Sequence, residues 1–270
     1  MRYCHIRGCK VYVTMNTLVG DREIDAAVEL AQKASEYGAD ALLVQDLGLV
    51  RVLRSAVPDL PLHASTQMSI HNLAGVEAAA QLGLTRAVLA RELSLEQIRY
   101  ITKNASIETE VFVHGALCFC HSGQCYMSSL IGRRSGNRGM CAQPCRLQYS
   151  LGGRMDEYPL SLKDNCLAEH LRELEDAGVA SLKIEGRMKR PEYTGIVTGV
   201  YSKVLREHRK PTAEEMELLE QAFSREGFTQ GYFDGDKKDM FGTRVGTDRP
   251  DEAIFTRARK EYGDGEVRRV

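Results

Sequence analysis

The chain has 270 residues, of which 43% are hydrophobic and 27% are charged. This composition excludes disorder as the main state, and the length allows one large core or two modest ones. Its 36 Lys and Arg residues nearly balance its 37 Asp and Glu residues, so any surface that attracts nucleic acid must be local. No run approaches the roughly 18 apolar residues of a membrane span, and no secretory signal opens the sequence. We therefore expect a cytoplasmic protein with no membrane partner.

Six short apolar segments alternate with longer segments of helical periodicity. The predicted strands lie near residues 11, 41, 62, 87, 110 and 181. This alternation is typical of parallel β/α units. Ser94, followed by Gln97 three residues later, predicts a capping box for the helix "LEQIRYITKN".

The alternation breaks after the fifth strand, where about 65 residues rich in Cys, Gly and Arg precede "ASLKIEG". This interval contains a predicted hairpin turning at Gly152 and Gly153 and a predicted helix, "CLAEHLRELEDAG". Pro191 marks a later helix start. After the helix in "PTAEEMELLEQAFSREGF" we expect a loosely structured tail from about Gly227. The predicted organisation is a partial β/α barrel over residues 1–208 with a Cys-rich insertion at 115–166, then a C-terminal helix and tail over 209–270.

Six strands fit an open doubly wound sheet, whereas a TIM-type β/α barrel has eight. The strand ends favour the barrel, because polar residues follow each apolar run and a barrel gathers its strand ends into one site. These residues are Asn16, Thr17, Gln45, Asp46, His63, Ser65, Gln67, Arg91, Glu92, His114, Glu185 and Arg187. The alternative is that strand ends are polar simply because they meet water.

Six of the eight cysteines lie within 49 residues, and in a reducing cytosol this clustering indicates a metal rather than disulfides. Cys118, Cys125, Cys141 and Cys145 are separated by six, fifteen and three residues. Zinc and a four-iron four-sulfur cluster both accept four Cys, and the wide first spacing favours the cluster. Buried structural thiols are the alternative. Cys120 and Cys166 are substitute ligands, while Cys4 and Cys9 are expected to be inert.

The segment "EVFVHGALCFCHSGQCYMS" resembles the signature of a collagenase-like family of unclassified peptidases, family U thirty-two. The matching residues are Glu110, Phe112, Gly115, Ala116, Leu117, Cys118, Gly123, Cys125, Met127 and Ser128. "HASTQMSIHN", "NRGMCAQPCR", "LSLKD" and "DAGVASLKIEGRMKRPEYTGIVTGVY" are also similar to family segments, so the resemblance covers roughly residues 8 to 208.

The resemblance implies a function other than proteolysis. Better understood members are oxygen-independent hydroxylases of a tRNA uridine or a ribosomal RNA cytidine, with prephenate as the hydroxyl donor, and related pairs hydroxylate ubiquinone precursors. Members with an assigned cofactor carry a four-iron four-sulfur cluster, which implies Cys118, Cys125, Cys141 and Cys145 as its ligands here.

This chain departs from the family pattern at its start, where members usually have two further strand and helix units. The departure would explain why six strands are predicted instead of eight. An incomplete barrel would expose unpaired strand edges. A second chain in a homo- or hetero-oligomer is one way to complete it.

The basic residues near the cysteines and near "IEG" predict a positive mouth that suits a prephenate-like dicarboxylate or an RNA backbone. They are Arg133, Arg134, Arg138, Arg146, Lys183, Arg187, Lys189 and Arg190. Scattered ion pairs on a solvated face are the alternative. Tyr126, Tyr149 and Tyr193 are candidates for base stacking, although each is more often a core residue.

The predicted catalytic residues are His63, Gln67, His114, Glu185 and Arg187. His63 and His114 suit proton transfer, because an unperturbed imidazole titrates near neutral pH. A satisfied polar role in the barrel mouth is the alternative for either residue. Glu185 and Arg187 alternate to one face of the last predicted strand, and a structural ion pair is the competing interpretation.

The leading hypothesis is an iron-sulfur, prephenate-dependent hydroxylase of RNA, with tRNA favoured over ribosomal RNA because "KIEGRMKRPEY" resembles the tRNA-directed branch. A metal-dependent collagenase-like peptidase is the second hypothesis, although the sequence has no "HExxH" helix. The third is a noncatalytic remnant or partner subunit.

Overall fold

The structure is a computed structural model that describes residues 1–243 and 252–263. Its contacts divide the chain into two compact units. Unit 1 comprises Met1–Val111, Cys120–Pro144 and Val179–Ser181. Unit 2 comprises Phe112–Phe119, Cys145–Gly178 and the described residues from Leu182 onward. The Cys-rich interval is therefore shared between the units, and so is the longest strand, which begins in unit 1 and ends in unit 2.

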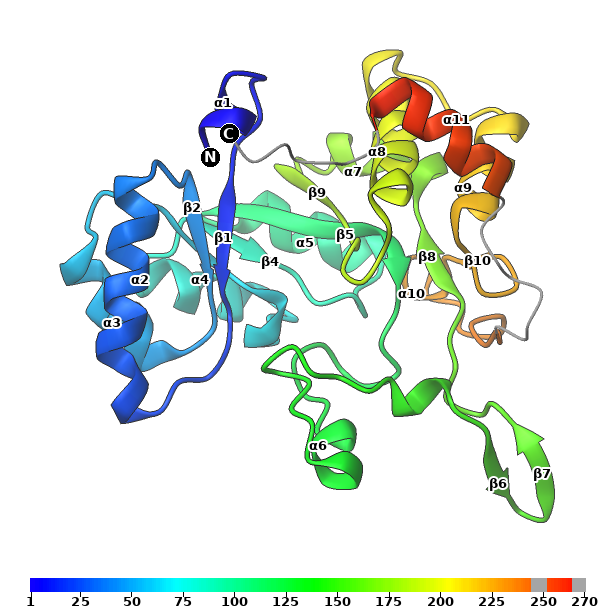
Figure 1. Cartoon of the computed structure of the whole chain (residues 1–270), viewed down its shortest axis with the longest axis horizontal. Helices are drawn as coiled ribbons and strands as arrows, with labels where there is room; N and C mark the ends of the chain where they lie inside the picture. The colour runs from blue at the N-terminus through cyan, green and yellow to red at the C-terminus, as the bar shows by residue number, and fades with distance from the viewer. Residues whose placement is uncertain (244–251, 264–270) are drawn as a thin grey trace. The chain divides into compact units, whose positions relative to one another are not determined.

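Unit 1 is an alternation of strands and helices around a parallel sheet in the order β1-β2-β3-β4-β5 (Figure 1). Its strands are β1 Tyr12–Met15, β2 Ala41–Val44, β3 Leu62–Ala64, β4 Arg86–Val88 and the first part of β5 Glu108–Ala116. Its helices are α1 Arg2–His5, η1 Asp21–Glu23, α2 Ile24–Glu36, α3 Leu47–Ala56, η2 Thr66–Met68, α4 Leu73–Gln81, α5 Leu95–Asn104 and α6 Met127–Gly132.

Local side-chain chemistry explains where the helices of unit 1 begin. The Asp46 carboxylate accepts a hydrogen bond from the backbone N–H of Leu49 at 2.8 Å and so caps α3. At α5, Ser94 and Gln97 form the predicted capping box. Strand β2, which precedes α3, is apolar, and all four of its residues are buried. A parallel strand covered on both faces requires this pattern.

Unit 2 is built around the second part of β5, which pairs antiparallel with β8 Asp164–Cys166. β8 pairs in parallel with the short β10 Phe228–Thr229, and β9 Ser181–Ile184 pairs with β5. The hairpin β6 Tyr149–Leu151 and β7 Arg154–Glu157 forms a separate two-stranded sheet. The helices are η3 Pro144–Arg146, η4 Ala168–His170, α7 Leu171–Asp176, α8 Pro191–Arg206, α9 Ala213–Ala222, α10 Gly231–Asp234 and α11 Glu252–Tyr262.

Helices α8, α9 and α11 pack on one another in unit 2 (Figure 1). Gly199 on α8 allows α11 to approach, because a Cβ at this position would lie 2.6 Å from the Tyr262 hydroxyl oxygen. Phe255 and Ala258 are the buried residues of α11. This packing differs from the loosely structured tail that the sequence predicted, although residues 244–251 and 264–270 of that tail lie outside the described part.

The α/β class and the mostly parallel pairing agree with the prediction, and all six predicted strands are present. The hairpin at Gly152 and Gly153 and the helix start at Pro191 are also confirmed. The structure adds β8 and β10, which the sequence did not predict. The helix expected in "CLAEHLRELEDAG" is shorter, because Cys166 belongs to β8 and α7 starts only at Leu171.

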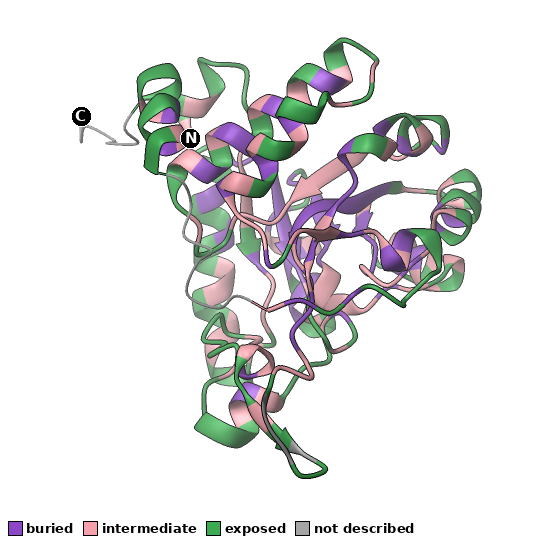
Figure 2. Ribbon diagram, turned by 90° about the vertical axis from the view of Figure 1, so that its right-hand side faces the viewer, coloured by how far each residue is buried: buried purple, intermediate pink, exposed green. Residues whose placement is uncertain are grey.

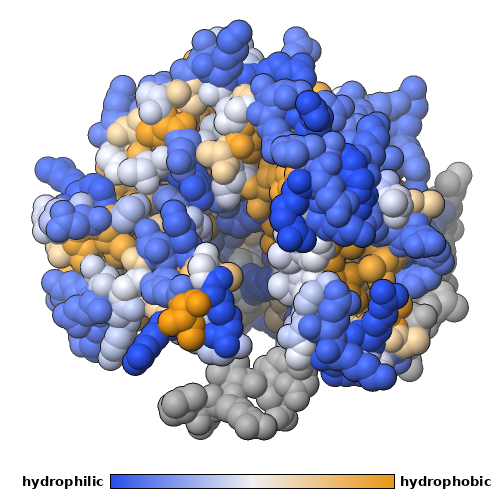
Figure 3. Space-filling model, turned by 90° about the horizontal axis from the view of Figure 1, so that it is seen from above, coloured by the Kyte–Doolittle hydropathy of each residue, from blue (hydrophilic) through white to orange (hydrophobic). Residues whose placement is uncertain are grey.

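Burial follows this architecture, since the strands are mostly buried and the outer faces of the helices are exposed (Figure 2). On the face drawn in Figure 3, hydrophilic residues predominate and hydrophobic ones lie in small separate areas. Within the described residues, no helix has both the length and the apolar character needed to cross a membrane.

Candidate functional site

Polar side chains at the ends of neighbouring parallel strands interact in unit 1. The Asn16 amide, just after β1, donates a hydrogen bond to the Ser65 hydroxyl oxygen after β3 at 3.0 Å. The Gln45 amide after β2 donates to the Gln67 carbonyl oxygen at 3.2 Å. Because all these strands are parallel, their carboxyl ends meet at one edge of the sheet. The predicted gathering of polar strand ends therefore holds within unit 1.

The segment Cys120–Pro144, which we call the Cys-rich segment of unit 1, lies against these strand ends. Gly123 makes the closest approach, since a Cβ there would lie 2.5 Å from the Gln67 carbonyl oxygen, and its φ is +80°. Only glycine tolerates that conformation and that proximity without strain. Further along the segment, the Asn137 amide donates to the Gln45 side-chain oxygen at 2.6 Å.

Two of the predicted ligands, Cys125 and Cys141, lie beside Gly136 in the Cys-rich segment of unit 1. A Cβ at Gly136 would lie 3.7 Å from the Cys141 Cβ and 3.9 Å from the Cys125 carbonyl oxygen. Both cysteines are exposed. The Cys141 sulfur accepts a hydrogen bond from the Gln143 backbone N–H at 3.3 Å.

The other two predicted ligands, Cys118 and Cys145, belong to unit 2 and lie near Arg146. Arg146 donates hydrogen bonds to the carbonyl oxygens of Leu117 and Leu162 and to the Ser161 hydroxyl. Burial and then the charge of Arg225 lower the Arg146 pKa, while the Cys145 and Cys118 thiolates favour its charged form. Arg146 thus fixes the chain beside both cysteines, a structural role in addition to the predicted contribution to a positive mouth.

The four predicted ligands therefore fall into two pairs, one in each unit, and their convergence on one centre stays a prediction. Among the substitute ligands, Cys120 is half-buried in unit 1. Cys166 is fully buried on β8, where its sulfur lies 3.6 Å from the Tyr201 hydroxyl oxygen. Burial raises the Cys166 pKa, which disfavours the thiolate that a metal requires.

The predicted catalytic residues are also divided between the units. In unit 1, His63 is buried on β3 with its ring edge-on to Tyr12 at a centroid distance of 5.1 Å. Gln67 lies in η2, where its carbonyl oxygen contacts the Cys-rich segment of unit 1 as described above. Their catalytic roles stay predictions.

His114 belongs to unit 2. Its side chain is buried on β5, and its Nδ1 lies 3.2 Å from the Tyr201 hydroxyl oxygen. Burial, followed by the charge of Lys189, lowers the His114 pKa to about 3. The protein core thus disfavours the imidazolium, which favours the structural role for His114, and its catalytic role stays a prediction.

Glu185 and Arg187 correct one expectation. Strand β9 ends at Ile184, so the two residues do not share a strand face. The Glu185 carboxylate instead accepts a hydrogen bond from the Arg187 backbone N–H at 3.1 Å, which closes a turn. The Glu185 N–H donates to the His114 carbonyl oxygen at 2.9 Å, so the turn lies beside the end of β5 within unit 2.

Several of the basic residues expected at a positive mouth have local partners. Arg138 forms a two-pronged ion pair with Glu23 at 2.6 and 2.7 Å in unit 1. Arg190 pairs with Glu252 at 2.7 Å in unit 2, and Arg134 donates to the Met140 carbonyl oxygen. Lys183 lies over the Phe112 ring and Lys189 over the rings of Tyr193 and Phe223, all in unit 2. Arg133 is exposed, and Arg187 lies in the turn after β9. Ion pairing therefore reduces the positive charge that the sequence predicted.

The three tyrosines differ in their exposure. Tyr126 is exposed just before α6, whereas Tyr193 is buried on α8 and donates to the Glu185 carbonyl oxygen at 3.3 Å. Tyr149 lies on the β6–β7 hairpin. Burial raises the Tyr193 pKa, so this residue is a core tyrosine and not a stacking platform.

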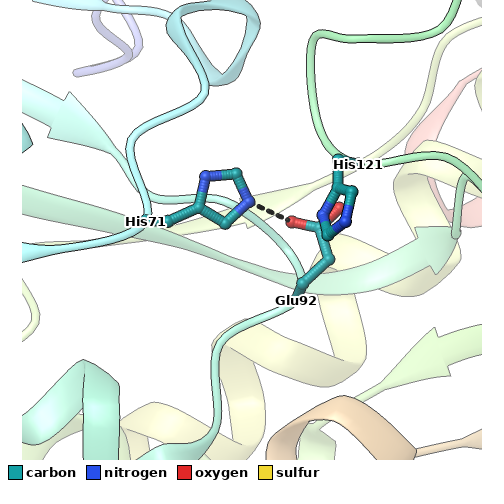
Figure 4. A group of neighbouring side chains, drawn as sticks. All are labelled: His71, Glu92 and His121. Atoms are coloured by element: carbon teal, nitrogen blue, oxygen red, sulfur yellow. Dashed lines mark ion pairs between the residues drawn. The ribbon is translucent and has the colours of Figure 1, made fainter.

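A cluster that the sequence analysis did not identify lies at the strand ends of unit 1. It consists of His71, Glu92 and His121, whose ligand atoms lie within 4.8 Å of one another (Figure 4). His71 Nε2 and Glu92 Oε2 are 3.2 Å apart. The available signal was weak: Glu92 follows a predicted strand and His121 adjoins a Cys, but no spacing rule joins the three residues.

A family model matches most of the sequence. The model of peptidase family U32 matches residues 1–241. The chain belongs to peptidase family U32. The family match extends over both units, including the Cys-rich interval and the strand ends beside it.

Individual relatives carry different names. A 23S rRNA 5-hydroxycytidine synthase of Escherichia coli is 44% identical over 209 residues, covering 75% of this chain and 32% of the relative. A tRNA hydroxylation protein of Bacillus subtilis is 35% identical over 210 residues, covering 73% of this chain and 50% of that protein. A protein of Porphyromonas gingivalis named collagenase is 31% identical over 277 residues, covering 93% of this chain and 66% of that protein. This chain thus spans between about one third and two thirds of the length of these relatives.

Proposed function

We propose that this chain takes part in the oxygen-independent hydroxylation of an RNA nucleoside. The observation that carries the proposal is the 44% identity to a protein named for ribosomal RNA hydroxycytidine synthesis. The similar match to a tRNA hydroxylation protein supports RNA as the substrate class. The proposal includes prephenate as hydroxyl donor and a TIM-type β/α barrel to which this chain contributes six strands.

The proposed cofactor is a four-iron four-sulfur cluster on Cys118, Cys125, Cys141 and Cys145. Each of the two cysteine pairs is suited by its surroundings to metal ligation. Cys125 and Cys141 are exposed neighbours around a glycine, and Cys118 and Cys145 lie near the Arg146 guanidinium. A cluster held by four thiolates would supply electron transfer.

The residues of the chain would serve the reaction by fixing this segment. Gly123 and Asn137 hold the Cys-rich segment of unit 1 on the strand ends, and Arg146 holds the chain next to Cys118 and Cys145. Arg133, which is exposed in unit 1, offers positive charge for a dicarboxylate or for phosphates. His114 would stay neutral at physiological pH and so would position its neighbours and not carry a proton.

The test is mass spectrometry of tRNA and ribosomal RNA nucleosides from a strain in which the gene has been deleted. We expect either hydroxyuridine in tRNA or hydroxycytidine in ribosomal RNA to disappear, and the nucleoside that is lost identifies the substrate. The wild-type gene and a Cys9→Ala control should restore it, whereas Cys141→Ala should not. Unchanged levels of both nucleosides in the deletion strain would contradict the proposal.

A metal-dependent peptidase is the second candidate, because one relative is named collagenase. It predicts that purified, metal-loaded protein degrades gelatin and that a chelator stops the reaction. Intact gelatin after prolonged incubation with protein of verified metal content would remove this candidate.

A further inference from the structure

Three segments of unit 1 bring two imidazoles and a carboxylate together at the strand ends. His71 follows η2, Glu92 follows β4, and His121 lies near the start of the Cys-rich segment of unit 1. Figure 4 shows the His71 ring directed at the Glu92 carboxylate, with the His121 ring beside the same carboxylate. The His71 and His121 rings are edge-to-face at a centroid distance of 5.7 Å.

The hydrogen bonds of His71 define its tautomer. Its Nδ1 lies 2.8 Å from the Ser69 carbonyl oxygen, which can only accept, so Nδ1 carries a proton. In the neutral ring Nε2 is then an acceptor with a lone pair. This Nε2 atom is buried and has no hydrogen-bond partner among the described residues.

Glu92 is arranged in a complementary way. Its Oε1 accepts hydrogen bonds from the Ser122 backbone N–H at 2.7 Å and from the Ser122 hydroxyl at 3.1 Å. Its Oε2 is buried without a hydrogen-bond partner in the described structure and faces His71 Nε2 at 3.2 Å. Two acceptor atoms facing each other at this distance repel unless a positive centre lies between them.

We propose that His71, Glu92 and His121 bind a divalent cation, zinc or ferrous iron, at a site separate from the cysteines. Zinc ligands lie about 2.0 to 2.2 Å from the ion, which places neighbouring ligand atoms of a tetrahedral site about 3.3 Å apart. The His71–Glu92 separation matches that geometry. His121 is exposed, so its side chain can turn to complete the set.

The surroundings of the ligands support a built site. Metal-binding histidines usually donate their second N–H to a carbonyl or carboxylate, and ligating carboxylates are themselves hydrogen-bonded. His71 donates its second N–H to the Ser69 carbonyl oxygen, and the Glu92 carboxylate accepts a hydrogen bond from the Ser122 N–H. Two histidines and one carboxylate form the protein ligand set of catalytic zinc and of non-haem iron, and they leave positions open for an oxygen ligand.

The cation would join the Cys-rich segment of unit 1 to the sheet. His71 and Glu92 come from the strand ends, whereas His121 and the Ser122 that holds Glu92 come from the segment. This role does not depend on RNA hydroxylation, because it follows from the ligand atoms alone.

The test is titration of chelator-treated full-length protein with Co²⁺ under anaerobic conditions. Cobalt bound by nitrogen and oxygen gives visible d–d absorption without the strong near-ultraviolet band of thiolate ligation. We expect wild-type protein and a Cys125→Ala, Cys141→Ala double variant to bind one equivalent of Co²⁺ with the absorption of nitrogen and oxygen ligands. His71→Ala and the isosteric Glu92→Gln should weaken the affinity for this Co²⁺ more than about 100-fold.

The matched control is another imidazole and carboxylate pair of unit 1, for which the described part of the chain supplies no third ligand. His5 Nε2 lies 2.9 Å from the Asp40 carboxylate, and His5→Ala should leave cobalt binding unchanged. Circular dichroism verifies that each variant is folded. The proposal would be overturned if Co²⁺ bound only with the thiolate absorption. It would also be overturned if both His71→Ala and Glu92→Gln still bound Co²⁺ with the affinity of wild type.

Discussion

Each unit contains a polar pair whose facing atoms are buried, and the two pairs differ in how completely they are satisfied. In unit 2, Arg225 Nη1 contacts both Asp164 carboxylate oxygens, at 2.7 and 2.8 Å. In unit 1, His71 Nε2 and Glu92 Oε2 face each other at 3.2 Å, and both atoms are acceptors when the imidazole is neutral. A donor facing an acceptor stabilises the fold, whereas two facing acceptors require a proton or a cation between them. The second arrangement is therefore suited to a positively charged ligand.

The largest effect on stability is expected for the Arg225–Asp164 pair of unit 2. Asp164→Ala would leave Arg225 buried without its partner, and we expect it to lower the free energy of unfolding by about 3 to 5 kcal/mol. Denaturant unfolding measures the loss. Asp239→Ala is the matched control, because the Asp239 side chain is 84% exposed and its pair with Lys163 should contribute less than about 1 kcal/mol. Equal losses in the two variants would contradict the distinction between buried and exposed pairs.

The next effect concerns the ligand cluster of unit 1. Ser122→Ala removes a hydroxyl that donates to Glu92 Oε1, and we expect it to weaken the proposed cation site by about 10- to 100-fold. Cobalt titration measures the change. Ser129→Ala, in the same segment, should retain wild-type affinity because its hydroxyl lies near the Arg134 carbonyl oxygen instead. A Ser122→Ala affinity equal to wild type would show that Ser122 does not orient a ligand.

A pH effect distinguishes the core of unit 2 from its surface. Burial lowers the folded pKa of His114 to about 3, whereas an unfolded histidine titrates near about 6.5. Between these values the unfolded chain binds more protons, so this stability is complete above about pH 6.5 and is lost as the pH falls. His114→Gln should reduce the slope of unfolding free energy in that window by about 1.4 kcal/mol per pH unit. An unchanged slope would place His114 in contact with water.

The smallest effect is the opposite of what deletion of an ion pair usually produces. In metal-free protein, Glu92→Gln lets a side-chain amide donate to His71 Nε2, so we expect stability to be unchanged or raised by up to about 1 kcal/mol. Thermal unfolding in the presence of a chelator measures it. A loss above about 2 kcal/mol would instead mean that the pair is an ordinary salt bridge to a charged His71.

The sequence predicted the strands whose stability comes from local apolar runs. β2 illustrates this, because its four residues "ALLV" are all buried. β8 could not be predicted in the same way. Its first residue is Asp164, which is buried only because Arg225, distant in the sequence, neutralises it. Polar residues stabilised by remote partners carry no local strand signal.

The candidate site shows the same division. The cysteines were visible because their spacing and the glycines around them form a local pattern. His71, Glu92 and His121 come from three separate segments that only the fold brings together, so no motif marks them. The low pKa of His114 was also hidden, because it results from burial against residues of α8 that are remote in the sequence.

The proposed function depends most on one iron-sulfur centre held by four cysteines. Iron and acid-labile sulfide should be measured in anaerobically purified protein, together with single Ala variants of Cys118, Cys125, Cys141 and Cys145 and a Cys9→Ala control. We predict about four iron and four sulfide per chain in wild type and control, with a marked loss in each of the four variants. Zinc without sulfide would contradict this proposal. So would a cluster that persists when the cysteines of either pair are substituted.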